Sequence, residues 1–170
     1  QKTAYEIKEC DWSSDVCSSD LPRPPQYRGD RRGIRVVFSP MAPHQIPAPR
    51  AEGFTTSTPI PLYWARWGPE GRDPIVVLHG GPGASHDYLL PQLLDLANSH
   101  DSLFYDQRGG GRSKTDDRTP ITWEVQVADL ARLLHEHGQR APTLVGYSWG
   151  ALLAMLYTIE AAAGRIAPLP

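Results

Sequence analysis

The sequence predicts an α/β fold, with a mostly parallel sheet that carries helices on both faces. From Glu52 onward, short apolar segments alternate with longer segments whose apolar residues recur at helical spacing. One short segment, Ile75–Gly80 (IVVLHG), holds four consecutive aliphatic residues, which is typical of a strand buried on both faces of a parallel sheet. Strands joined by helical crossovers form such a sheet, so this strand should be central.

Two strands are expected before the central one. The segments Glu52–Thr58 and Ile60–Trp67 are rich in Thr, Tyr and Trp, with prolines between them. This pattern predicts an antiparallel pair. The following cluster, Gly68–Asp73 (GPEGRD), is typical of a turn.

A helix and a strand are expected next. Leucines recur at helical spacing across Asp87–Asn98, and because Pro91 lacks an N–H, the helix proper should begin near that residue. The apolar segment Ser102–Tyr105 (SLFY) then predicts another buried strand.

The last elements repeat this alternation. A Gly-rich loop, Asp106–Ser113, leads to a helix that begins near Thr122, whose hydroxyl can cap it, and ends before Gly138. A strand is expected over Thr143–Val145 and a helix over about Trp149–Ala163.

The start of the chain does not fit this pattern. Asp11–Leu21 (DWSSDVCSSDL) shows neither apolar period, and it resembles the translation of a common short-read sequencing adapter. Gln1–Ile7 (QKTAYEI) similarly resembles the outer primer of that adapter. We therefore interpret residues 1–21 as an adapter-derived artefact that takes no part in the fold.

Residues 22–40 are rich in Pro and Arg and are interpreted as an untranslated or disordered extension, with Met41 as the start. The alternative is a natural extension in which Ile34–Phe38 forms an edge strand. Residues 41–170 comprise one domain's worth of chain, which is enough for a core if the domain is complete. They are expected to be the N-terminal part of one domain, an expectation that rests on the order of the catalytic residues.

The charge balance gives no indication of an electrostatic partner. The chain has 17 Lys and Arg against 19 Asp and Glu, and residues 22–170 retain 15 and 14 of these. We therefore expect neither nucleic acid nor a membrane surface as a partner, and the sequence leaves the oligomeric state open. No apolar span is long enough to cross a membrane, so a cytoplasmic protein is predicted.

The segment Gly146-Tyr147-Ser148-Trp149-Gly150 carries the chemistry. A G-x-S-x-G sequence between a strand and a helix predicts a nucleophile elbow, in which the turn places Ser148 in a strained backbone conformation. Its hydroxyl would then stand at the carboxyl edge of the sheet, beside the amino end of the next helix, which favours negative charge.

A second motif, His79-Gly80-Gly81-Pro82-Gly83, follows the central strand. Its glycines let the backbone approach a ligand closely, so the N–H groups of Gly81 and Trp149 are candidates for an oxyanion hole. His79 is expected to hydrogen-bond to backbone nearby and not to act as the catalytic base. With both cysteines in residues 1–21, no Cys-based metal site is expected.

Other polar residues have more than one interpretation. Asp106, Arg108 and Arg112 could contact substrate, but an ion-paired loop that braces the site is the favoured interpretation. His135 and His137 lie near a predicted helix end, where a cation suits the helix dipole, and they make a poor metal pair.

The three segments HGGPG, DQRGGGRS and GYSWGA, in that order, resemble the proline iminopeptidase group of the α/β-hydrolases. The resemblance covers Glu52 to about Ala163. It implies an α/β-hydrolase fold and hydrolysis of a small peptide or ester through an acyl-enzyme on Ser148, with no metal or organic cofactor. One departure is Ala151, where the family usually has Gly.

The resemblance leaves other functions open. Esterases and lactonases share the sheet, whereas epoxide hydrolases would place Asp at position 148. A non-catalytic α/β binding protein remains a further alternative.

The order of the catalytic residues predicts that the chain is a fragment. In this fold the triad runs Ser, then Asp or Glu, then His, yet the 22 residues after Ser148 contain no His and no Asp, and their one acid, Glu160, lies about three turns along the helix. We therefore expect a chain truncated after the nucleophile helix, without its C-terminal half and cap, that is inactive and poorly soluble.

Overall fold

The computed structural model describes residues 46–139 and 141–166. The interpretations of residues 1–21 and 22–40, and of Met41 as the start, lie outside this described part. Among the described residues, no helix is long and apolar enough to cross a membrane.

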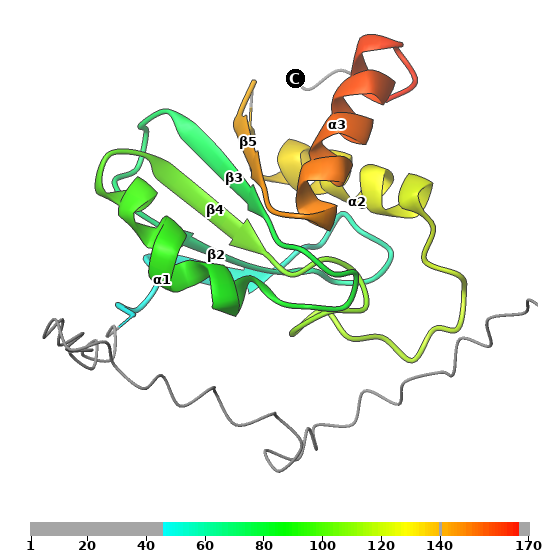
Figure 1. The fold of residues 1–170 in the computed structure, drawn as a ribbon, viewed down its shortest axis with the longest axis horizontal. Helices are drawn as coiled ribbons and strands as arrows, with labels where there is room; N and C mark the ends of the chain where they lie inside the picture. The colour runs from blue at the N-terminus through cyan, green and yellow to red at the C-terminus, as the bar shows by residue number, and fades with distance from the viewer. Residues whose placement is uncertain (1–45, 140, 167–170) are drawn as a thin grey trace, which may run out of the picture. The chain divides into compact units, whose positions relative to one another are not determined.

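Five strands form one mixed sheet within the described residues, in the order β1-β2-β4-β3-β5 (Figure 1). The strands β1 (Ala51–Phe54) and β2 (Tyr63–Trp67) are antiparallel, and β2 is also antiparallel to β4 (Asp101–Tyr105). The strand β3 (Pro74–Leu78) runs parallel to β4 and to β5 (Thr143–Gly146). The predicted central strand therefore lies at the centre of the parallel part.

Alternate residues of the strands pack into two apolar layers, as the two-residue period of a strand requires. On one face, Val76 and Leu78 of β3 pack with buried leucines of the helix α2 (Trp123–Glu136) and with Leu153 of α3 (Trp149–Ala162). On the other face, Ile75 and Val77 pack with the short helices that follow β3. Helices thus cover both faces of the sheet, and the predicted α/β class is confirmed.

The predicted helix over Asp87–Asn98 is correct in place but not in type. The structure has a 3-10 helix η1 (His86–Leu89), one α-helical turn α1 (Leu90–Leu93) and a second 3-10 helix η2 (Leu94–Asn98). Pro91 lies in the first turn of α1, where its missing N–H costs least. The spacing of the leucines predicts a helical segment but does not distinguish these hydrogen-bond patterns.

The start of α2 also differs from the expectation. Thr122 occupies the N-cap position with extended backbone, but its side chain makes no capping hydrogen bond among the described residues. Its carbonyl instead accepts a hydrogen bond from the Gln126 N–H at 3.2 Å. At the other end, Gly138 has a φ of 59°, which is the left-handed conformation predicted for the residue past the helix.

Candidate active site

Ser148 lies between β5 and α3, at the N-cap of a 14-residue helix, and its side chain is exposed. Its φ of 53° and ψ of −119° place it in a region that non-glycine residues rarely adopt. The strain predicted for the elbow is therefore present, and the residue does not point into the core.

The glycines on either side of Ser148 allow the tight turn. A Cβ on Gly150 would collide with the Leu78 carbonyl oxygen of β3, and one on Gly146 would lie 2.5 Å from the Gly150 backbone. A hydrogen bond of 3.1 Å from the Tyr147 N–H to the Leu78 carbonyl keeps the elbow close to the end of β3. The elbow is thus packed directly against the end of β3.

The segment His79–Gly83 continues from β3 and passes next to the elbow. Gly80 is buried, and a Cβ on it would lie 3.3 Å from Ser148 Cβ. Gly81, Pro82 and Gly83 form an exposed turn, in which Gly81 has a φ of 129°. The predicted oxyanion loop and the predicted nucleophile are therefore neighbours.

His79 is fully buried, and both of its ring nitrogens are engaged. The Gln107 N–H donates to His79 Nε2 at 2.9 Å, so the proton resides on Nδ1 and is donated to the Gly80 carbonyl at 2.6 Å. Burial lowers the pKa of His79 below its ordinary value of 6.5, which keeps the ring neutral. His79 hydrogen-bonds to backbone, as predicted, and neither nitrogen is free to serve as a base.

The two candidate oxyanion donors are available. Within the described part of the chain, neither the Gly81 N–H nor the Trp149 N–H has a hydrogen-bond acceptor. Trp149 is the first residue of α3, where an N–H lacks an intrahelical partner. An anion near Ser148 would also benefit from the helix dipole.

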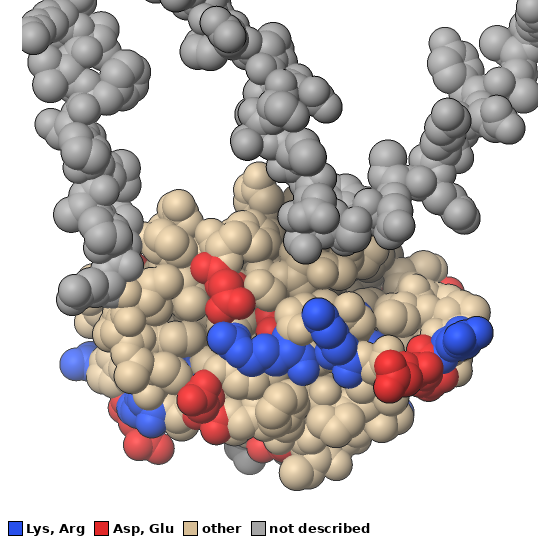
Figure 2. Space-filling model, turned by 90° about the horizontal axis from the view of Figure 1, so that it is seen from below, with Lys and Arg blue, Asp and Glu red and all other residues tan. Residues whose placement is uncertain are grey.

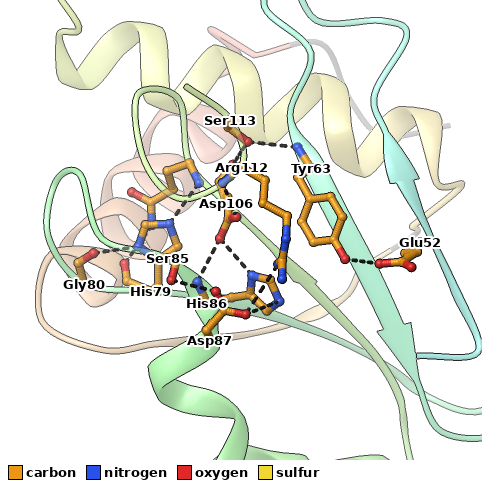
Figure 3. A network of polar contacts seen from close by, with 11 residues as sticks. Glu52, Tyr63, His79, Gly80, Ser85, His86, Asp87, Asp106, Arg112 and Ser113 are labelled. Carbon is orange, nitrogen blue, oxygen red and sulfur yellow. Dashed lines mark hydrogen bonds and ion pairs between the residues drawn. The ribbon is translucent and has the colours of Figure 1, made fainter. Parts of the chain in front are cut away.

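Asp106 joins the loop after β4 to the loop after β3 (Figure 3). Its fully buried carboxylate accepts hydrogen bonds at 2.8 Å from the His86 N–H, from His86 Nδ1 and from the Arg112 N–H. Burial alone would raise the pKa of Asp106, but these hydrogen bonds hold it below its ordinary value of 3.8. Asp106 thus acts as a charged anchor between the two loops.

Arg108 and Arg112 differ in their surroundings. Arg108 forms two hydrogen bonds of 2.7 Å to the buried carboxylate of Asp129 on α2, a bidentate pair. The half-exposed Arg112 lies 4.5 Å from the centre of the Tyr63 ring and 3.4 Å from Asp87. These contacts fit the interpretation of the loop as a brace.

The interpretation of His137 as a cation at the end of α2 is wrong. Burial, and after it the charge of Arg66, lowers the pKa of His137 to about 4. The His137 ring packs edge-on against the Trp64 ring, with 4.5 Å between the ring centres, so His137 behaves as a neutral packing residue. Among the residues that the structure describes, no three His, Cys, Asp or Glu side chains form a group that could hold a metal ion.

Charges of both signs lie on the face viewed in Figure 2. Lys and Arg side chains form a band across it, and Asp and Glu side chains lie directly beside the band. This face carries mixed charge, in agreement with the near balance of the composition.

Comparison with known proteins identifies the family. A family model described as the alpha/beta hydrolase fold matches residues 73–167, more than half of the chain. The chain belongs to the α/β-hydrolase fold family.

Two curated relatives of this α/β-hydrolase chain are proline iminopeptidases. The protein from Lactobacillus crispatus is 40% identical over 93 residues, covering 52% of this chain and 31% of that protein. The protein from Saccharolobus solfataricus is 38% identical over 113 residues, covering 64% of this chain and 36% of that protein. The chain therefore spans about a third of the length of these relatives.

A solved structure shows the same arrangement. The proline iminopeptidase-related protein from Thermus thermophilus superposes with a TM-score of 0.61 at 28% identity, covering 65% of this chain and 40% of that protein. The predicted α/β-hydrolase fold is confirmed.

Several residues of this α/β-hydrolase site were not anticipated from the sequence. Tyr88 bonds to Gly80, and His86 and Asp129 are the partners of the predicted Asp106 and Arg108. The partners are separated by 20 residues for His86 and Asp106 and by 21 for Arg108 and Asp129. No local spacing encodes such contacts. The only signal for His86 and Tyr88 was that they closely follow the HGGPG segment, and Asp129 had no such signal.

Proposed function

We propose that this chain is part of a serine hydrolase in which Ser148 is the nucleophile. The observation that carries the proposal is the strained backbone of Ser148, with φ 53° and ψ −119°, at the N-terminus of α3. A conformation of this cost persists only where its surroundings hold it, and such strain is concentrated at functional sites. The exposed side chain and the neighbouring Gly80 support the same role.

In the proposed reaction, Ser148 Oγ attacks the carbonyl carbon of the substrate while a general base takes the hydroxyl proton. The carbonyl oxygen becomes negatively charged and accepts hydrogen bonds from the N–H groups of Gly81 and Trp149. The base then gives the proton to the leaving nitrogen or oxygen, the C–N or C–O bond breaks, and water hydrolyses the acyl-enzyme.

We propose that the general base comes from outside the described residues. Within residues 46–139 and 141–166, no hydrogen bond reaches the Ser148 hydroxyl, and His79 is engaged with backbone. Glu160, the acid of the nucleophile helix, pairs instead with Arg165 at 2.6 Å. A complete triad therefore requires an imidazole that this segment does not bring to Ser148.

For the substrate, we propose a small peptide with an N-terminal proline. The proline iminopeptidases at 40% and 38% identity support this class. We further propose that the enzyme acts in the cytoplasm without a metal or organic cofactor. Ala151 departs from the family pattern next to the elbow, so an esterase is the second candidate.

The nucleophile is tested in the full-length protein with a fluorophosphonate, which phosphonylates an activated serine. We expect one label per chain, located on the peptide that contains Ser148, and loss of labelling in Ser148→Ala. Hydrolysis should fall by about 10⁴-fold or more in that variant. Ser99→Ala, an exposed serine at the end of η2, is the matched control and should react as the wild type does.

Labelling that persists in Ser148→Ala would show that Ser148 is not the nucleophile. Turnover of a proline anilide and of simple chromogenic esters then separates the two substrate classes. Preference for the esters would contradict the peptidase assignment while leaving the serine mechanism intact.

A further inference from the structure

Three side chains meet at the backbone of Gly80. A Cβ built on Gly80 would lie 2.8 Å from the Tyr88 hydroxyl and 3.3 Å from Ser148 Cβ. It would also lie 3.3 Å from Tyr147 Cδ1. Because Gly80 directly precedes the proposed oxyanion donor Gly81, a contact that orients Gly80 acts on the oxyanion site.

Side chains hydrogen-bond both polar groups of the peptide between His79 and Gly80. The Gly80 N–H donates to the Tyr88 hydroxyl at 2.6 Å, and Gln107 Nε2 donates to the His79 carbonyl at 2.7 Å. The carbonyl of the next peptide, on Gly80, accepts from His79 Nδ1 at 2.6 Å. Since peptide groups are planar, these bonds fix two successive planes, and the second plane carries the Gly81 N–H.

The Tyr88 ring has its own support, independent of its hydroxyl. It packs edge-on against the Tyr147 ring, with 6.1 Å between centres and an angle of 70°. Both rings line a pocket of about 380 Å³ beside the elbow, together with Leu89 and Val145. Removing only the hydroxyl should therefore leave the ring in place.

We propose that Tyr88 is a positioning residue for the oxyanion loop, an inference that rests on the proposed function. The Tyr88 hydroxyl accepts a hydrogen bond from the Gly80 N–H and so fixes the peptide between His79 and Gly80. This helps to orient the next peptide, whose Gly81 N–H then points at the developing oxyanion. Without the hydroxyl, the N–H of a buried residue loses its acceptor, and rotation of the plane toward another partner becomes favourable. Catalysis is sensitive to such small misplacements.

The test is Tyr88→Phe in the full-length protein, with Tyr157→Phe as the matched control. Tyr157 lies on α3 and packs into the core, and within the described residues its hydroxyl makes no hydrogen bond. We expect Tyr88→Phe to lower kcat and the rate of phosphonylation of Ser148 by about ten-fold or more, with KM within about two-fold. A donor that acts in the transition state affects kcat in this way.

Hydrogen exchange of the Gly80 amide gives a second measurement, which does not depend on activity. Exchange should become faster in Tyr88→Phe and stay unchanged in Tyr157→Phe. If Ser148 reacts in both variants at the wild-type rate, or if KM rises while kcat is unchanged, the positioning role is wrong and the proposed function stands. If the wild-type Ser148 does not react at all, the proposed function fails and this inference fails with it.

Discussion

Ser148 has a backbone conformation that favours glycine. Its φ of 53° and ψ of −119° resemble those of the first central residue of a type II′ turn. Such a conformation costs a non-glycine residue on the order of 1–3 kcal/mol. Hydrogen bonds of the elbow hold it in place, including those from the Gly150 N–H to the Tyr147 carbonyl at 2.9 Å and from the Ala151 N–H to the Ser148 carbonyl at 3.0 Å.

This strain predicts that a variant without the nucleophile can be more stable. We expect Ser148→Gly to have a free energy of unfolding about 1 kcal/mol higher than Ser148→Ala, because glycine adopts a positive φ without steric cost. Chemical denaturation of both variants measures the difference. At Ser99, where φ is −130°, the same pair of substitutions should show no such advantage for glycine. Equal stability of the two Ser148 variants would contradict the strain.

The sequence predicted this residue because the elbow is local. Five consecutive residues between an apolar strand and an apolar helix specify the turn, and the collision of a Cβ on Gly150 with Leu78 explains one of the glycines. Tyr88 could not be identified in the same way. Its role depends on how the loop after β3 folds back on itself, which a single sequence does not encode.

At the scale of elements, the site depends on how the loops after β3 and β4 are joined. The sequence predicted both strands and the loop Asp106–Ser113, but it did not predict that Asp106 would bind His86 across the site. The low pKa of the Asp106 carboxylate indicates that its charged form is favoured in the folded state. The contact between the two loops therefore depends on the charged form of Asp106, and its contribution to stability should depend on pH.

We expect Asp106→Asn to lower the free energy of unfolding by about 2 kcal/mol at pH 7, because one carboxylate oxygen becomes an NH₂ group that faces an N–H donor. The folded pKa of Asp106 is below the ordinary 3.8, so its stabilisation is fully present above about pH 4 and is lost as the pH falls through the folded pKa. Urea denaturation from pH 7 to pH 3 should show the difference between wild type and variant shrink below about pH 4.

Asp95→Asn is the matched control, because Asp95 is exposed on η2. It should change the free energy of unfolding by less than about 0.5 kcal/mol. A difference between wild type and Asp106→Asn that stays constant down to pH 3 would show that the charge of Asp106 does not stabilise the contact between the two loops.

At the scale of the whole molecule, two apolar layers enclose the sheet, but one side is less covered. Within the described residues, β5 is an edge strand, and α3 exposes 57% of Met155 and 57% of Ile159. Unpaired strand edges and exposed apolar side chains favour association, so poor solubility stays a prediction for the 170-residue chain. The four consecutive aliphatic residues of Ile75–Gly80 and the helical crossovers predicted a sheet covered on both faces. The exposure of individual α3 residues depends on which elements lie next to that helix, which these patterns do not specify.

Residues just before β1 make hydrogen bonds to β2, to the residue after β2 and to β4. Arg50 Nη2 donates to Asp101 Oδ1 at 2.9 Å, and Arg50 Nε donates to the Gly68 carbonyl at 3.0 Å. The Trp67 indole N–H donates to the Pro47 carbonyl at 2.9 Å. The Asp101 side chain is only 8% exposed, and its nearest cation is Arg50, with Arg66 Nη1 farther away at 3.8 Å from Oδ2.

These contacts predict that residues just before β1 contribute to the stability of the fold. A chain that begins at Met41 should unfold with a free energy within about 0.5 kcal/mol of the 170-residue chain, because the favoured interpretation gives residues 1–40 no part in the fold. A chain that begins at Ala51 should lose about 2 kcal/mol or more, since the Asp101 charge loses Arg50 and the Trp67 N–H loses its acceptor. Arg50→Gln within the Met41 chain isolates the charged part of that loss. If removal of residues 1–40 were as costly as removal of residues 1–50, part of that segment would belong to the folded protein. The interpretation of residues 22–40 as an untranslated or disordered extension would then be wrong, in favour of the alternative in which Ile34–Phe38 forms an edge strand.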